Sequence, residues 1–299
     1  MRRLVQAGLT ILLAAGLTGC GGSTARTVSS GVESLRVVAT TTQLADFARN
    51  VGGDRIQLTQ LLKPNVDPHE YEPTPSAAEA VANAKVVLRS GAGLDDWITK
   101  IRTGAGGAAT VVTTTDDVAL RGDDPHVWMD TRNAEVMVES IRDALSTADP
   151  AGARIYDTNA ARYNASLRAL DRELRNLISA VPRSKRTLVT DHDAFGYFAP
   201  RYGIRIVGAA IGSLSTSAEP DARHLAELVR TIQRQHVAVV FAEESVDPAL
   251  AKSLAKDAGV TVGAGLYADS LGPSDGPAGT YVGMMRQDME RMVAGFLAR

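Results

Sequence analysis

The chain has 299 residues, of which 44% are hydrophobic and 22% charged, so it can bury one large core or two medium ones. Its formal net charge is -2 at pH 7, its pI is about 6.2, and the sequence has no basic stripe with interleaved aromatic residues. This composition gives no electrostatic case for nucleic-acid binding, and no nucleic-acid partner is expected.

The N-terminal residues carry a targeting signal. Arg2 and Arg3 form a basic region, and the apolar stretch 4–17 is too short to be a stable membrane-spanning helix. The sequence LTGC then ends at Cys20 and looks like a bacterial lipobox, whose cysteine is lipidated and becomes the mature N-terminus. We predict a lipoprotein signal peptide over 1–20 and a lipid anchor at Cys20. The alternative is an ordinary signal peptide with a chance cysteine.

Cysteine usage limits how this chain can be stabilised. Cys20 is the only cysteine, so an intramolecular disulfide and a thiolate site elsewhere are both excluded. The stability of the fold must therefore come from packing. Residues 21–33, rich in Gly, Ser and Thr, are predicted to be a flexible tether.

Residues 34–148 alternate between short β-branched runs and amphipathic helical patterns, which is typical of an α/β lobe with a parallel sheet. Strands are expected at 35–40, 56–62, 85–89 and 111–112, and helices at 41–51, 75–84, 94–101 and 133–145. His69 lies in the loop 63–69, where two prolines and an asparagine prevent regular structure just past a strand. Ligands of open α/β sheets bind at such ends, although a lone loop histidine is more often simply solvated.

A second histidine, His126, also follows a proline in a loop. This loop spans Pro125–Asp130 and comes after an acidic run at 116–124. Asp130 can either cap the helix that follows or brace the imidazole, and the capping role is slightly favoured.

The stretch from Asp149 to Val181 is predicted to be one long helix. Asp149 can cap it, Pro150 fits its first turn, and Pro182 ends it. Its apolar residues recur at the spacing of a single buried stripe, from Tyr156 through Leu167 and Leu174 to Val181. Such a helix is roughly 45 Å long and can link two lobes, so 149–182 is predicted to be the linking segment.

Residues 183–299 repeat the α/β pattern and are predicted to form a second lobe. Strands are expected at 186–190, 204–208, 237–241 and from 260, and helices at 194–202, from 219, 248–258 and 280–297. His192 lies at a strand-to-helix junction, and Asp269 lies in the loop after the last strand. Both therefore have the same context as the first two histidines.

Glu243 and Glu244 come directly after the apolar run 237–241. They can orient an imidazole from behind, or they can simply face water, and the sequence does not separate the two roles. His224 and His236 lie in a helix or at its end, and no function is expected for them.

Four segments together resemble the zinc- and manganese-binding substrate-binding proteins of bacterial ABC importers. They are, in chain order, 65–75, 125–134, 191–198 and 266–272. The resemblance covers essentially the whole mature chain. It implies an α/β fold of two lobes, each with a mostly parallel sheet flanked by helices, which are joined by one long rigid helix. One metal ion would lie in the cleft between the lobes.

Carried over by position, the resemblance implies His69 and His126 as ligands from the first lobe, and His192 and Asp269 from the second. Three imidazoles and one carboxylate suit Zn²⁺. Manganese-binding members usually have a carboxylate where this chain has His192. The segment 113–124 lacks the long His-rich loop of many zinc importers, which leaves Mn²⁺ as the alternative.

The resemblance implies an extracytoplasmic, lipid-anchored monomer that captures the metal and delivers it to an ABC importer permease. No enzymatic activity is expected, because four protein ligands leave no open position for a reacting water. Two alternatives remain. One is a surface-tethered adhesin with a structural metal. The other is a zinc hydrolase with Glu243 or Glu244 as general base, although the chain contains neither HExxH nor HxxEH.

Overall fold

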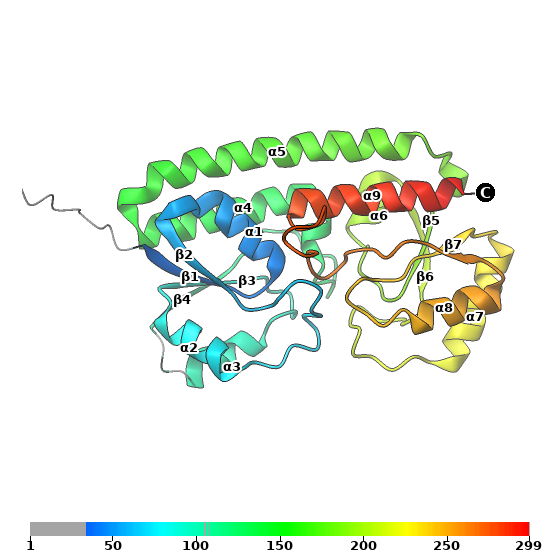
Figure 1. Ribbon diagram of the computed structural model, residues 1–299, viewed down its shortest axis with the longest axis horizontal. Coiled ribbons are helices and arrows are strands. Elements are labelled where there is room, and N and C mark those ends of the chain that lie inside the picture. Colours follow the sequence, from blue (N-terminus) through cyan, green and yellow to red (C-terminus); the bar gives the residue numbers. More distant parts are fainter. Residues whose placement is uncertain (1–33, 105, 107, 299) are drawn as a thin grey trace, which may run out of the picture. The chain divides into compact units, whose positions relative to one another are not determined.

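Figure 1 shows the computed structural model of the chain, which describes residues 34–104, 106 and 108–298. The predicted signal peptide, the lipidation site at Cys20 and the predicted tether lie outside these residues. Within the described part of the chain, no helix combines the length and the apolar character needed to cross a membrane.

The first lobe is built on a parallel sheet. Its strands pair in the order β2-β1-β3-β4 and are β1 (Leu35–Ala39), β2 (Ile56–Gln60), β3 (Val86–Arg89) and β4 (Thr110–Thr113). Val37 and Ala39 of β1 contribute to one core and Val38 to another. Both faces of the sheet are therefore covered, as parallel sheets require, and the carboxyl ends of the strands share one edge.

Helices cover the two faces of this sheet. They are α1 (Thr42–Gly52), α2 (Pro75–Asn83), α3 (Trp97–Gly104) and α4 (Thr131–Ala148), with 3₁₀ turns η1 (Gly53–Arg55) and η2 (Val127–Met129). α1 and α4 pack together on one face, and α2 and α3 on the other (Figure 1). The Asp130 side chain accepts a hydrogen bond from the N–H of Arg132 and caps α4. Of its two predicted roles, Asp130 thus takes the capping one.

The second lobe repeats this strand order in a looser form. Its parallel pairs are β5-β6 and β7-β8, formed by β5 (Thr187–Thr190), β6 (Arg205–Ala209), β7 (Val239–Val240) and β8 (Thr261–Val262). The N–H of Phe241 donates to the carbonyl oxygen of Val189 at 2.9 Å, which places β7 beside β5. The resulting order, β6-β5-β7-β8, matches that of the first lobe, with β6 in the place of β2.

The helices of the second lobe are η4 (Arg183–Lys185), α6 (Phe198–Tyr202), α7 (Ala222–Arg234), α8 (Ala249–Ala258) and α9 (Tyr281–Leu297). α6 is shorter than the helix predicted over 194–202. The N–H of Asp193 donates to the carbonyl oxygen of Ser213, which holds the residue before the predicted helix to another loop. Gly196 also disfavours helix, so the segment from 194 to 197 is not part of α6. α7 and α8 pack against each other, and α9 packs along the linking helix.

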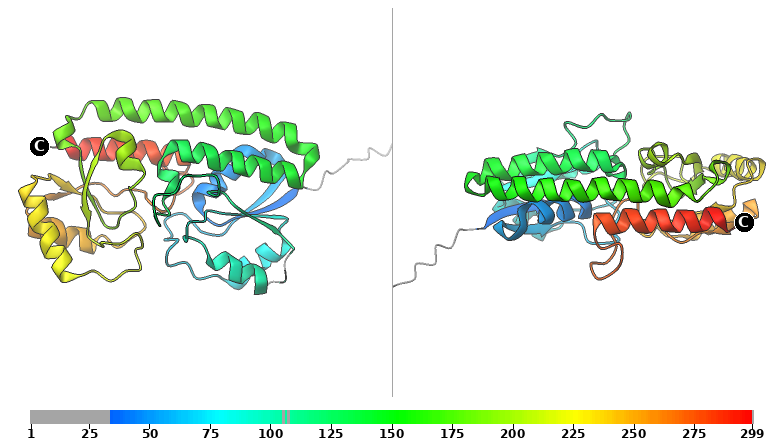
Figure 2. Two further views of the ribbon diagram at one scale, coloured as in Figure 1. Left: turned by 180° about the vertical axis from the view of Figure 1, so that it is seen from behind. Right: turned by 90° about the horizontal axis from the view of Figure 1, so that it is seen from above.

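The linking helix α5 (Ala153–Ser179) runs along both lobes (Figures 1 and 2). With 27 residues it is about 40 Å long, and it packs against α1 and α4 of the first lobe and against α6 and α9 of the second. It begins later than predicted, because Asp149 accepts hydrogen bonds from Arg55 and from the hydroxyl of Tyr156. Pro150 opens the 3₁₀ turn η3 (Pro150–Gly152) instead.

Polar contacts attach α5 to each lobe. The hydroxyl of Tyr163 donates to Asp46 of α1 at 2.8 Å, and the guanidinium of Arg201 in α6 makes two hydrogen bonds with Asp171. The predicted fold class, an α/β protein of two sheet-containing lobes joined by one long helix, is confirmed. The exact lobe boundaries, 34–148, 149–182 and 183–299, stay a prediction.

Candidate metal centre

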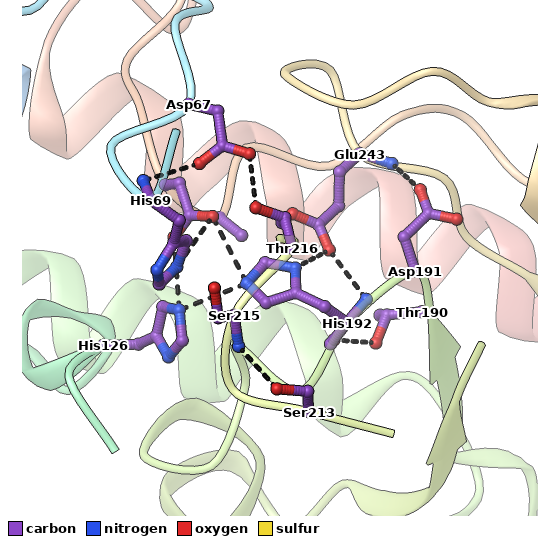
Figure 3. Close-up of polar contacts among 12 residues, drawn as sticks. Asp67, His69, His126, Thr190, Asp191, His192, Ser213, Ser215, Thr216 and Glu243 are labelled. Atoms are coloured by element: carbon purple, nitrogen blue, oxygen red, sulfur yellow. Dashed lines mark hydrogen bonds and ion pairs between the residues drawn. The ribbon is translucent and has the colours of Figure 1, made fainter. Parts of the chain in front are cut away.

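Four side chains from distant parts of the sequence meet between the two lobes. Each of His69, His126, His192 and Asp269 offers one ligand atom, and these atoms all lie within 4.8 Å of one another. The Nε2 atoms of His126 and His192 are 3.2 Å apart. Asp269 places Oδ1 3.2 Å from His126 Nε2 and Oδ2 3.2 Å from His192 Nε2. Figure 3 shows the three imidazoles converging.

The strand ends of the two sheets bring these residues together. His69 follows β2, and His126 follows β4 and precedes η2. In the second lobe, His192 follows β5 and Asp269 follows β8. The carboxyl ends of parallel strands lie at one edge of a sheet, and this is the edge where α/β proteins bind ligands. The two such edges face each other here.

Burial differs among the four. His126, His192 and Asp269 are fully buried, whereas the side chain of His69 keeps 7% of its surface exposed. His69 Nε2 lies 3.6 Å from Asp269 Oδ2. Burial lowers the pKa of His69, which favours the neutral imidazole that can donate a lone pair to a metal.

Two carboxylates behind the rings set the direction in which the imidazoles present their lone pairs. Asp124 Oδ1 lies 2.8 Å from His126 Nδ1, and Glu243 Oε1 lies 2.6 Å from His192 Nδ1. A carboxylate accepts, so each Nδ1 donates a proton to it, and in the neutral ring the lone pair is then on Nε2. Both Nε2 lone pairs point into the space between the lobes, as in the carboxylate–histidine–metal arrangements of proteins.

The electrostatics of the site favour positive charge at its centre. Burial opposes charge on His126, but the carboxylates of Asp269 and Asp124 outweigh burial and raise the pKa of this imidazole. Glu243 and Asp269 likewise outweigh burial and hold the pKa of His192 well above its usual range. Burial also disfavours the Asp269 carboxylate, yet His192 and His126 keep its pKa well below the ordinary value. A buried anion is thus maintained where a cation would be bound.

Several atoms at this centre have unused bonding capacity. Within the described residues, the two carboxylate oxygens of Asp269 and the Nε2 atom of His69 are buried and have no hydrogen-bond partner of good geometry. Buried polar groups are normally satisfied, so unpartnered groups that converge on one point call for a shared partner. Three imidazole nitrogens and one carboxylate oxygen form a donor set that suits a divalent transition metal.

The loop that carries Asp269 is anchored to the first lobe. The indole N–H of Trp128 donates to the carbonyl oxygen of Ala268, and the N–H of Leu271 donates to the hydroxyl of Thr42. The N–H of Tyr281, where the loop enters α9, donates to Asp46. Sequence order places Asp269 with the second lobe, but its neighbours are bonded to α1 and η2.

Asp124 is not among the predicted site residues, although a local signal for it exists in the sequence. The tripeptide Asp-Pro-His occurs twice, at 67–69 and at 124–126. In both copies the aspartate Oδ1 accepts the N–H of the histidine, at 2.8 Å for His69 and 3.0 Å for His126. This turn fixes each histidine relative to the aspartate two residues before it.

The remaining candidates are placed differently. Glu243 is buried against His192, whereas Glu244 pairs with Arg291 at 2.7 Å. His224 lies in α7 with its Nε2 2.8 Å from the carbonyl oxygen of Ala209, and His236 follows α7 with a positive φ of 51°.

The chain is similar to known proteins over nearly its whole length. The chain matches the family model described as zinc-uptake complex component A, periplasmic, over residues 37–295. The manganese-binding lipoprotein MntA of Halalkalibacterium halodurans is 31% identical over 300 residues, which cover 99% of each chain. The iron-binding protein YfeA of Yersinia pestis is 32% identical, and the match covers 90% of this chain and 88% of YfeA.

Solved structures show the same fold. The periplasmic zinc binding protein TroA from Treponema pallidum has a TM-score of 0.83 and 29% identity, covering 88% of this chain and 99% of TroA. A manganese-bound periplasmic metal binding protein from Candidatus Liberibacter asiaticus has a TM-score of 0.78 and 27% identity, covering 87% of this chain and 99% of its own. The chain therefore belongs to the zinc-uptake complex component A family, the substrate-binding proteins of metal ABC transporters.

Proposed function

We propose that this protein binds one divalent transition metal ion as its transport substrate and delivers it to an ABC importer permease. The ligands in this proposal are His69, His126, His192 and Asp269. One observation carries it: two braced imidazoles from opposite lobes direct their Nε2 lone pairs at each other, beside a buried carboxylate with unused oxygens. A bound cation would satisfy all of these groups together.

Zinc is the metal we propose, with manganese as the alternative. A four-ligand set of three neutral nitrogens and one carboxylate matches the tetrahedral preference of Zn²⁺, and zinc also stands above manganese in general affinity for such sites. The names of similar proteins point in several directions, since they include manganese-, iron- and zinc-binding members. The proposal of zinc therefore rests on the donors of this chain.

We also propose that the protein acts outside the cytoplasm as a monomer held to the membrane by a lipid on Cys20. Support comes from the LTGC sequence that ends at Cys20 and from the relatives named as lipoproteins. A carrier of this kind must bind tightly outside the cell and release at the permease. Ligands contributed by two lobes link metal binding to the closeness of the lobes, and so meet both needs.

The rival functions fit the side chains less well. A hydrolase needs a general base beside an open metal position, but Glu243 is occupied with His192 and Glu244 with Arg291. An adhesin with a structural metal would bind the ion without any transport. Uptake measurements separate this alternative from the proposal.

The decisive experiment begins with metal analysis of protein purified without added metal. Titration of the stripped protein with Zn²⁺ and Mn²⁺, alone and in competition, should give one ion per chain and tighter binding of zinc. Deletion of the gene should lower uptake of the same metal, and the wild-type gene should restore it. Binding without any effect on uptake would favour the structural-metal alternative.

A further inference from the structure

A serine-rich loop of the second lobe lies against the loop that carries His69. This loop, Ser213–Ser217, is here called the strap; it follows β6, the strand that occupies in the second sheet the place of β2 in the first. The strap and the His69 loop are therefore counterparts in the two lobes. Figure 3 shows Thr216 beside Asp67, close to the imidazoles.

The strap is bonded on two sides to residues that lie one or two positions from proposed metal ligands. On one side, the carbonyl oxygen of Ser213 accepts the N–H of Asp193, the residue after His192, at 3.0 Å. On the other side, the hydroxyl of Thr216 donates to Asp67 Oδ2 at 2.5 Å. The strap thus connects the loops of two ligands that belong to opposite lobes.

Asp67 serves the strap in a way that its counterpart Asp124 does not. Both aspartates accept the N–H of the histidine two residues later. Asp124 uses the same Oδ1 to hold the ring of His126, whereas Asp67 uses its second oxygen for Thr216. The other Asp-Pro-His segment is joined to the second lobe through its backbone, because the hydroxyl of Tyr197 donates to the carbonyl oxygen of Asp124 at 3.4 Å. Asp67 instead uses its carboxylate for the bond between lobes.

The position of this bond coincides with the accessible side of the site. His69 is the one ligand of the four whose side chain keeps some exposure. An ion that leaves the centre without disturbing the fully buried ligands must pass on the side of His69. The bond between Asp67 and Thr216 lies next to this residue and holds its loop to the second lobe.

The strap holds its own shape through its hydroxyl groups. The N–H of Ser215 donates to Ser213 Oγ at 3.1 Å, and the N–H of Ser217 donates to Ser215 Oγ at 3.3 Å. Such side-chain-to-backbone bonds define local turns. Loss of the Thr216 hydroxyl would leave these bonds in place, so its contact with Asp67 can be removed selectively.

We propose that the hydrogen bond from Thr216 to Asp67 is a latch that slows release of the bound metal. Thr216 and Asp67 are positioning residues in this scheme, because they hold the His69 loop and do not themselves bind the ion. The proposal rests on the proposed function and adds a specific control of its release step. Loss of the latch is expected to raise the rate of metal dissociation and to leave the coordination of the metal unchanged.

The test uses the full chain loaded with Zn²⁺ and mixed with excess chelator, so that the release rate is observed directly. Thr216→Val should release zinc about tenfold faster, as expected for loss of one charge-assisted hydrogen bond. Thr216→Ser keeps the hydroxyl and should release at close to the wild-type rate. Ser217→Ala removes a hydroxyl of the same strap that bonds to Ser215, and it is the matched control with an unchanged rate.

A second measurement separates a latch from a change in coordination. The visible spectrum of the Co²⁺-loaded Thr216→Val protein should equal that of the wild type, because the four ligands are retained. Thr216→Ala provides the same measurements if the valine variant does not fold. A wild-type release rate in the variants that lack the hydroxyl, or an altered cobalt spectrum, would overturn the latch while leaving the proposed function intact. Failure of the wild-type chain to bind metal would overturn both.

Discussion

The Nε2 atoms of His126 and His192 lie 3.2 Å apart, although the two rings come from different lobes. Each ring is held from behind by a carboxylate of its own lobe, Asp124 in one case and Glu243 in the other. Two lone pairs at this separation repel unless a proton or a metal ion lies between them. In the proposed function, closeness of the lobes and occupation of the centre would therefore form one linked equilibrium.

Removal of a single ligand should weaken zinc binding strongly. His69→Ala, His126→Ala and His192→Ala should each lower the affinity by at least about a hundredfold, since each removes one of four donors from a total binding free energy of roughly 10–16 kcal/mol. Competition titration against a zinc chelator measures this effect. His224→Ala and His236→Ala are the matched histidine controls, and wild-type affinity is expected for both. A loss in the controls as large as in the ligand variants would contradict the assignment.

The carboxylates behind the rings should matter although they do not touch the ion. Asp124→Asn and Glu243→Gln remove the charge that orients and polarises His126 and His192, and the metal affinity should fall by about 10- to 100-fold. Glu244→Gln is the neighbouring control, since Glu244 pairs with Arg291. The same titration applies. Equal effects of Glu243→Gln and Glu244→Gln would show that the bond to His192 has no role in binding.

Zinc affinity should fall as the pH decreases. A proton and a metal ion compete for the same imidazole lone pair, and the pKa values of His126 and His192 are raised above the ordinary 6.5 by the surrounding carboxylates despite burial. Competition should therefore begin above pH 6.5 and grow as the pH falls, approaching about tenfold per pH unit for each proton displaced. Isothermal titration over a pH series measures it. Equal affinity at about pH 5 and pH 7.5 would argue against imidazole ligands.

The choice of metal can be probed at one residue. His192→Glu gives two nitrogens and two carboxylates, a donor set closer to the oxygen-rich coordination that manganese prefers. The zinc-to-manganese affinity ratio should shrink without inverting, because zinc remains higher in the general order of affinities. Competitive titration of both metals gives the ratio, with Asp269→Ala as a control that weakens both. An unchanged ratio together with unchanged total binding would remove His192 from the ligand set.

Attachment to the membrane should depend on Cys20. Cys20→Ala removes the only lipidation candidate, and we expect a folded protein that no longer fractionates with membranes. Membrane fractionation with a carbonate wash measures attachment, and circular dichroism confirms folding. Persistence of the variant in the washed membrane pellet would mean that another feature anchors the chain.

Much of the fold follows from local sequence pattern. Alternating apolar runs and helical stripes predicted the strands and helices of both lobes, because each element buries a periodic face. The start of α5 was missed for a reason that local pattern does not contain. Asp149 is a good capping residue, but its carboxylate is taken by Arg55, which lies far away in the sequence. A tertiary partner thus overrode a local preference.

The candidate site was predictable to different degrees. Position after a strand made His69, His126, His192 and Asp269 candidates, and the family resemblance implied them as one ligand set. The structure brings all four together. The role of Glu243 depends on β7 lying beside β5, which is a matter of strand order that a single sequence does not specify. For the same reason, sequence pattern did not separate Glu243 from Glu244.

The anchoring of the Asp269 loop divides the donors unequally between the two lobes. Leu266, at the start of this loop, is bonded to the second lobe, but Ala268 and Leu271 on either side of Asp269 are bonded to Trp128 and Thr42 of the first. A rotation of the second lobe that kept the bonds to Trp128 and Thr42 would leave a tripod of two imidazoles and one carboxylate around the ion. The vacated coordination position would face the receding lobe. The same rotation would break the hydrogen bond from Thr216 to Asp67, so the tripod would form only once the latch has opened.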